Sequence, residues 1–278
     1  MISSFVITFR ETLEAALIIG IILAYLVKTK RTKYNNIVYL GITSAIIASI
    51  IAAFLFNSLA GGFTGRAEEI FEGIAMLFAA FLITFMILWM LKQKHVQVEL
   101  HQKVQKEIDE QHKAGLFFLV FISVFREGIE TVIFLSAANF ATSATNGLMG
   151  ALIGIIAAVI LGYAIFVWGK NLNLKKFFNV TGVILILFAA GLVVHGVHEF
   201  QEAKLLPTYI EHVWDMNPPE NPDGSFPALH EKGSVGSIAK GLLGYNGNPS
   251  LIEVFSYLAY ILAIVLLWRN IDKVHEVI

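Results

Sequence analysis

The sequence has no cysteine, few charged residues and no proline outside one stretch. Of its 278 residues 15% are charged and 56% are hydrophobic, and the mean hydropathy is +0.71. Without cysteine the chain forms no disulfide framework and no thiolate metal site, so we expect any bound metal to use oxygen or nitrogen ligands. Such low charge with such high hydropathy excludes an ordinary soluble domain of this length. The composition predicts a protein that crosses a membrane several times.

Long apolar runs set the predicted fold class. A helix needs roughly 20 apolar residues to cross a bilayer, and seven segments meet that length. Because helices satisfy their own backbone hydrogen bonds in lipid, we expect an all-α integral membrane protein. The first segment lacks the basic start of a cleavable signal and is expected to remain as a helix. The segments lie near residues 2–27, 35–56, 69–91, 115–138, 147–169, 177–198 and 250–269.

Lysine and arginine are spread unevenly over the connections between these segments. Alternate connections hold 14 of these residues on one side and four on the other. Because basic connections remain in the cytoplasm, the N-terminus is predicted outside and the C-terminus inside. Trp89, Trp168 and Trp268 then fall at cytoplasmic helix ends, where an aromatic belt is expected. The external 199–249 connection contains all six prolines, and its residues 234–243 have the apolar spacing of a short amphipathic helix.

Two matching charged motifs interrupt the first and fourth segments. They are Arg10-Glu11-Thr12-Leu13-Glu14 and Arg126-Glu127-Gly128-Ile129-Glu130. A charge near the bilayer centre costs from about 2.5 to more than 10 kcal/mol, so the repeated pattern indicates a function. Residues three or four apart share a helix face, so the two glutamates of each motif point the same way. If the faces meet, four carboxylates and two guanidiniums leave two negative charges, which a hard multivalent cation would balance.

A weaker match suggests that the motifs belong to a longer internal repeat. Leu77-Phe78-Ala79-Ala80 in the third segment is answered by Leu187-Phe188-Ala189-Ala190 in the sixth. Residues 1–91 and 115–198 would then be two three-helix units joined by a cytoplasmic connection at 92–114, with 250–269 as a seventh helix. Because each unit has an odd number of helices, the units would be inverted, as in transporters whose site lies between such repeats.

A second group of potential ligands falls at the predicted external face. It opens the third segment and closes the sixth. Histidine and glutamate at helical spacing can bind a metal as an external capture site, although helix-end solvation and packing also account for them. Glu72 lies furthest into an apolar run and is the strongest candidate. The group comprises Glu68, Glu69, Glu72, His195, His198, Glu199 and Glu202.

The paired Arg-Glu-x-x-Glu motifs resemble those of the oxidase-dependent iron permease family, within the iron/lead transporter superfamily. Supporting matches at residues 69–74, 171–174 and 241–245 extend the resemblance over nearly the whole chain, and the absence of a long tail favours a bacterial member. The resemblance implies a single-domain, high-affinity permease that imports iron across the cytoplasmic membrane of a prokaryote. It implies iron as substrate, with no permanent cofactor. The implied iron ligands are Glu11, Glu14, Glu127 and Glu130, beside Arg10 and Arg126.

The same family suggests an external ferroxidase or a periplasmic iron-handling protein as partner, besides iron ions and the bilayer, and it suggests no nucleic acid. Several alternatives stay open. The substrate can be lead or another divalent cation, or the chain can be an integral-membrane metal-dependent oxidase or protease. It can also be a protein that binds a metal without moving it. Finally, each motif can be an ion pair that only fixes helix packing.

Overall fold

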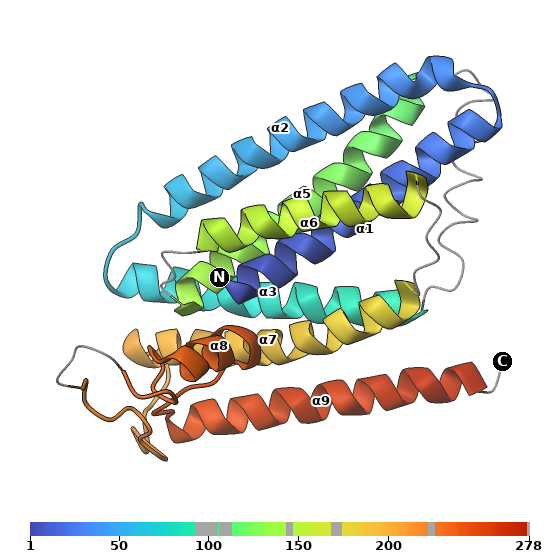
Figure 1. The fold of residues 1–278 in the computed structure, drawn as a ribbon. Coiled ribbons are helices and arrows are strands. Elements are labelled where there is room, and N and C mark those ends of the chain that lie inside the picture. The colour runs from blue at the N-terminus through green and yellow to red at the C-terminus, as the bar shows by residue number, and fades with distance from the viewer. Residues whose placement is uncertain (93–104, 106–112, 143–146, 168–173, 222–225, 277–278) are drawn as a thin grey trace.

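The computed structural model describes residues 1–92, 105, 113–142, 147–167, 174–221 and 226–276 (Figure 1). Within these ranges the regular structure is entirely helical, as the apolar segments predicted. The structure gives the bounds of eight α-helices and one short 3-10 helix, η1, within these described ranges. They are α1 (Ile2–Lys28), η1 (Thr32–Tyr34), α2 (Asn35–Ala60), α3 (Arg66–Lys92), α5 (Lys113–Thr142), α6 (Gly147–Val167), α7 (Leu174–Glu202), α8 (Ser234–Leu243) and α9 (Leu251–Glu276).

Each predicted apolar segment corresponds to one long helix, and α8 has the bounds that its apolar spacing predicted. Most of the predicted 92–114 connection lies outside the described residues, as do Trp168 and the 171–173 part of the motif before α7. Of the described helices, α2, α3, α6, α7 and α9 are long and apolar enough to cross a membrane. Helices α1 and α5 are equally long, but each carries the three charges of its Arg-Glu-x-x-Glu motif.

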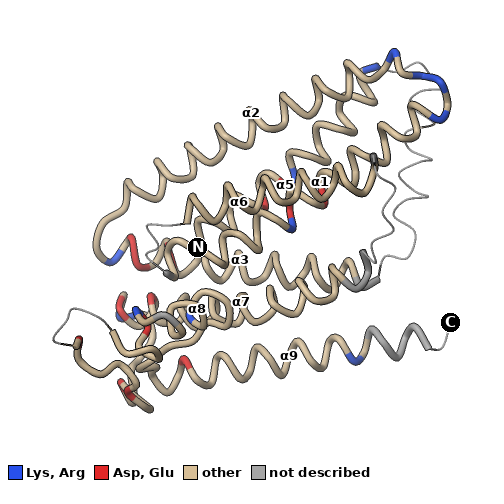
Figure 2. Tube along the Cα trace, viewed as in Figure 1, with Lys and Arg blue, Asp and Glu red and all other residues tan. Residues whose placement is uncertain are grey.

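The outward faces of the bundle are apolar, as lipid contact requires. Most of the large hydrophobic side chains left exposed belong to α2, α6 and α9. Helices α2 and α9 run along opposite edges of the bundle (Figure 1). Charged residues instead gather at the two ends of the bundle and where α1 passes α5 (Figure 2). This arrangement, with the sequence relationship reported below, makes the chain a multi-pass membrane protein.

The helices pair across the two predicted repeats rather than within them. The most extensive contact is between α1 and α6, and α2 packs in a corresponding way on α5. The third helices of the two units, α3 and α7, pack on each other, and so do the first helices, α1 and α5. Each unit therefore gives its second helix to the first helix of the other unit.

Small residues allow the closest of these contacts. Gly150 and Gly154, one turn apart on α6, face the first two turns of α1, where a methyl group would meet the Met1 and Phe5 carbonyl oxygens. Between them, the carbonyl oxygen of Ala151 lies 2.9 Å from the hydroxyl of Thr8, which donates to it. Small residues four apart typically bring membrane helices this close, as expected for Gly154.

The apolar interior is divided into two clusters, and α1 and α5 contribute to both. On α1, Ile7 belongs to one cluster and Ile22 to the other. On α5, Phe134 belongs to the first and Val124 to the second. The charged motif of each helix lies between these residues, so both motifs lie at the boundary between the two cores.

The long 203–250 connection is fixed to the bundle through α8. Gly244 ends α8 in a left-handed conformation, with φ of 67°, and its backbone lies directly against Gly191 of α7. Glu231 holds the preceding turn, because it accepts hydrogen bonds from Lys240 Nζ at 2.7 Å and from the Gly247 amide at 2.8 Å. Glycine is therefore required at position 244 of the 241–245 motif, because the backbone there is left-handed and lies directly against Gly191.

Alanine at position 191 is expected to destabilise the protein, because its methyl group would collide with the backbone of Gly244. Overpacking of this kind typically costs about 1–3 kcal/mol. Gly182→Ala on the same helix is the matched control, since its methyl group would reach Ile87 at an ordinary 3.7 Å. Thermal unfolding of the purified protein in detergent should show a lower midpoint for Gly191→Ala only. Equal midpoints for the two variants would contradict the backbone contact.

Glu231→Gln is expected to weaken the 203–250 connection in a pH-dependent way. Burial alone would raise the pKa of Glu231, but the bonds from Lys240, Gly247 and Asn217 outweigh it and lower the pKa below 4.5. A lowered carboxyl pKa gives stability that is present above the unfolded value and lost as the pH falls through the folded one. The variant should lose roughly 1 kcal/mol at pH 7.

The difference between Glu231→Gln and the wild type should shrink as the solution is acidified below pH 4.5. Unfolding midpoints measured across a pH series test this, with exposed Glu220 changed to glutamine as the control. A difference that persists unchanged into acid would show that the ion pair with Lys240 is not its source.

Candidate functional site

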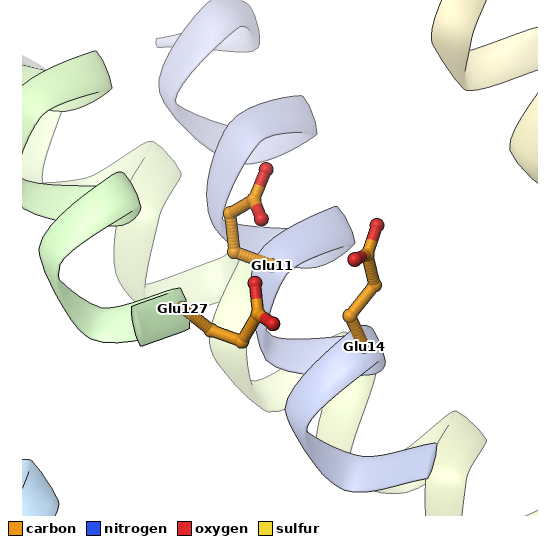
Figure 3. Close-up of side chains that lie close together, drawn as sticks. All are labelled: Glu11, Glu14 and Glu127. Atoms are coloured by element: carbon orange, nitrogen blue, oxygen red, sulfur yellow. The ribbon is translucent and has the colours of Figure 1, made fainter. Parts of the chain in front are cut away.

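Three glutamates from the two motifs converge where α1 and α5 pack together. Glu11 and Glu14 lie one turn apart on α1, and Glu127 faces them from α5 (Figure 3). One carboxylate oxygen from each lies within 4.8 Å of the other two, which is close enough for all three to bind one metal ion. Within the described part of the chain this is the one set of three acidic, histidine or cysteine side chains that meets this distance.

Each motif arginine contacts both glutamates of its own motif. Arg10 lies 2.9 Å from Glu11 Oε1 through Nη1 and 2.8 Å from Glu14 Oε1 through Nη2. Arg126 Nη2 donates to Glu127 Oε1 at 2.6 Å, and its Nε lies 3.7 Å from Glu130 Oε1. The i, i+4 pairing predicted for each motif is therefore present in the structure. Two guanidiniums still face four carboxylates.

The first motif is more deeply buried than the second. Arg10 is 1% exposed and Glu11 is fully buried, whereas the side chain of Arg126 is 49% exposed. Glu127 is buried, and Glu130, which is 19% exposed, lies outside the set of three. Glu130 therefore has a more accessible position than the other three glutamates.

Every one of the four carboxylates keeps a buried oxygen without a hydrogen bond among the described residues. Burying such a group unpaired is unfavourable by about 1–3 kcal/mol or more when it is charged. The Nε of Arg10 likewise finds no acceptor in the described chain. Glu14 Oε1 does lie 2.8 Å from Arg10 Nη2 as an ion pair, but without the geometry of a hydrogen bond. Three converging carboxylates, Glu11, Glu14 and Glu127, that keep such oxygens are an arrangement that a hard cation would complete. The four oxygens without a hydrogen bond are Glu11 Oε2, Glu14 Oε1, Glu127 Oε2 and Glu130 Oε2.

The last turns of α3 contact both motif arginines, and no sequence pattern predicts these contacts. Met86 Sδ lies 3.0 Å from Arg10 Nη1, and Met90 Sδ lies 2.8 Å from Arg10 Nη2. Between them, the Trp89 ring centroid lies 5.8 Å from Arg126 Cζ, a cation–π distance. Trp89, for which an interfacial belt is the sequence-based expectation, also faces a charge of the site. A motif search misses these residues because a methionine or a tryptophan in an apolar run is usually a packing residue.

The predicted external group comes together only in part. Glycines 73 and 196 bring the start of α3 against the end of α7, so Glu72 and Glu199 belong to neighbouring turns. However, these residues do not supply three ligand atoms within the distance that the motif glutamates meet. His195 Nδ1 instead donates to the Gly191 carbonyl oxygen at 2.8 Å.

His198 has a different partner, which the sequence did not single out. Its Nδ1 donates to Glu253 Oε1 at 2.9 Å, and Glu253 is buried in the first turn of α9. Glu202 is the second contact of His198, at 3.2 Å from Nε2. From Gly73 to Met86, α3 rises about 20 Å at 1.5 Å per residue, so this region and the motif site are separate.

A multi-pass helical membrane protein whose interior holds three converging carboxylates, with only two guanidiniums for four glutamates, has the features of a cation-handling membrane protein. Residues 1–271 match the family described as "Iron permease FTR1 family", and the chain belongs to that family. It is similar to the ferrous iron permease EfeU of Yersinia pestis, with 32% identity over 271 residues, which cover 96% of this chain and 93% of the relative.

EfeU of Escherichia coli O6:H1 is likewise 32% identical over 265 residues, covering 94% and 93% of the two chains. No solved structure matches the chain. The comparisons therefore place the whole chain in a family of iron transporters, and the geometry above identifies a candidate cation site within it.

Gly128→Ala is expected to disturb the site without removing a ligand. A methyl group on Gly128 would lie 2.7 Å from Ser49 Cβ and would push α2 away from α5 beside Glu127. Cation affinity, measured by titrating the purified protein with a divalent metal, should fall about tenfold, as when a supporting residue of a metal site is lost.

The double variant Gly128→Ala with Ser49→Gly removes the collision and should recover most of the affinity. Ser49→Gly alone is the control for loss of the serine. If the double variant binds as weakly as Gly128→Ala, close approach of α2 is not the role of Gly128.

Proposed function

We propose that this protein is a permease that imports iron through the site formed by its two Arg-Glu-x-x-Glu motifs. The observation that carries the proposal is the convergence of Glu11, Glu14 and Glu127, each with a buried oxygen that lacks a hydrogen bond. Glu130 is the fourth ligand, from a more accessible position. The relatives named above are ferrous iron permeases, which favours ferrous iron as the substrate.

In the proposed topology, α1, α2, α3, α5, α6, α7 and α9 all cross the cytoplasmic membrane of a prokaryote. The N-terminus lies outside and the C-terminus inside, as the lysine and arginine counts indicate. The start of α3 and the end of α7 then face outward, and the acidic residues there attract cations to the entrance. Glu72 and Glu199 are the residues of the capture group best placed to pass an ion inward.

The pairing of helices supports two inverted repeats with the site at their interface. Helix α2 of the first unit packs on α5 of the second unit, and α6 of the second unit packs on α1 of the first. These two contacts are therefore equivalent in the proposed repeat. The motifs lie where the two apolar cores meet, so a movement of one core against the other would change access to the glutamates while each core stays packed. Alternating access of this kind releases the ion inside. A ferroxidase or iron-handling protein outside is the proposed source of the metal.

Iron uptake should depend on the motif glutamates and not on acidic residues in general. Glu14→Gln and Glu127→Gln keep the size of each side chain but remove its charge, and each should lower uptake of radiolabelled iron at least about tenfold. Exposed Glu220→Gln is the matched control and should transport like the wild type. Uptake is measured in cells with equal amounts of each variant in the membrane.

If both motif variants take up iron as the wild type does, the motifs are ion pairs that fix helix packing and do not carry iron. Uptake of lead or manganese in place of iron by the wild type would keep the site but change the substrate. Glu130→Gln, measured in the same series, tests whether the more exposed fourth carboxylate contributes to uptake as much as the three convergent ones.

A further inference from the structure

The guanidinium of Arg10 lies in a pocket made of two kinds of ligand atom. Its Nη1 lies 2.9 Å from Glu11 Oε1 and 3.0 Å from Met86 Sδ. Its Nη2 lies 2.8 Å from Glu14 Oε1 and 2.8 Å from Met90 Sδ. Each terminal nitrogen therefore has one carboxylate oxygen and one thioether sulfur as neighbours. Met86 and Met90 are one turn apart on α3, so both sulfurs lie on one face of that helix.

These neighbours satisfy few of the hydrogen bonds that a permanently buried arginine needs. A guanidinium has five N–H donors, and thioether sulfur is a weak acceptor. The Nε of Arg10 has no acceptor among the described residues, although the side chain is only 1% exposed. The same four atoms suit a metal ion better, because a metal ion accepts the lone pairs of oxygen and sulfur directly.

We propose that Glu11, Glu14, Met86 and Met90 form a mixed carboxylate and thioether site for the transported ion, and that Arg10 occupies it until the ion arrives. The inference deepens the proposed function by adding two sulfur ligands to the glutamates. Arg10 withdraws toward the ring of Phe178, whose centroid lies 6.0 Å from its Cζ. Thioether sulfur favours softer metal ions, so the site prefers ferrous iron to harder ions such as manganese and magnesium.

The proposed preference for ferrous iron comes from the first motif, because the second motif has different neighbours. Arg126 is half-exposed and faces the Trp89 ring, with no sulfur contact in the described structure. Glu127 therefore adds an oxygen ligand to the shared site, whereas α3 supplies sulfur only beside α1. Sulfur selectivity depends on Met86 and Met90.

Silver ion is a probe of the sulfur ligands, since it binds thioethers strongly and the chain has no cysteine. The exposed Met1, Met149 and Met216 are the same in every variant, so the test is the silver binding that is lost when Met86 and Met90 are changed. The full-length protein in detergent is titrated calorimetrically with silver nitrate in chloride-free buffer. Met86→Leu with Met90→Leu keeps the volume of both side chains and should weaken silver binding about tenfold or more. Met76→Leu is the matched control, because Met76 is buried in the apolar core of the same helix.

X-ray absorption at the silver edge reports the ligand atoms directly. One equivalent of silver bound to the wild-type protein should show two sulfur neighbours, and the double variant should lose them. An oxygen-only shell in the wild type would overturn the proposal, as would unchanged silver affinity in the double variant. If the double variant does not fold, the single variants Met86→Leu and Met90→Leu carry the titration.

Transport in proteoliposomes tests the selectivity separately. The ratio of ferrous iron to manganese uptake should fall about tenfold in the double variant and stay unchanged in Met76→Leu. An unchanged ratio of ferrous iron to manganese uptake in the double variant would overturn the proposal that the two sulfur ligands set the selectivity. Absence of iron uptake by the wild type would instead refute the proposed function, while the silver titration would still decide whether the sulfur site exists.

Discussion

The structure depends on an imbalance of charge in its interior: four carboxylates share two guanidiniums at the contact between α1 and α5. Each arginine reaches both glutamates of its motif, yet every carboxylate keeps a buried oxygen without a hydrogen bond in the described structure. A low-dielectric interior penalises such groups unless a cation or a proton compensates them. A site of this kind is incomplete without a mobile positive charge, which is the property that a cation carrier needs.

The packing of the bundle explains how this unfavourable group of charges is held. Apolar clusters lie on both sides of the motifs along α1 and along α5, so burial on either side fixes the two helices at their contact. The close approach of α2 at Gly128 and of α6 at Gly154 adds to this restraint. Hydrophobic packing elsewhere thus stabilises an arrangement that electrostatics alone would disperse.

The two halves are alike in sequence motif but not in environment. Arg10 is buried among two carboxylates and two sulfurs, whereas Arg126 is half-exposed beside an aromatic ring. The expectation that a metal would find only oxygen or nitrogen ligands followed from the absence of cysteine. It left out methionine, whose thioether becomes a potential ligand when a charged site lies next to it.

The sequence by itself determined the helices, the bounds of α8 and the i, i+4 contact of each arginine with its own motif. These features depend on residues at most a few positions apart, so hydrophobic length and helical spacing suffice to predict them. Only the tertiary structure decided that Glu127 joins Glu11 and Glu14 while Glu130 lies further out. It also decided that His198 pairs with Glu253, that the external group lacks a metal-sized cluster, and that Met86 and Met90 face Arg10. Those contacts join helices that are far apart in the chain. They depend on how the helices pack against one another, and a local sequence pattern contains no information about that packing.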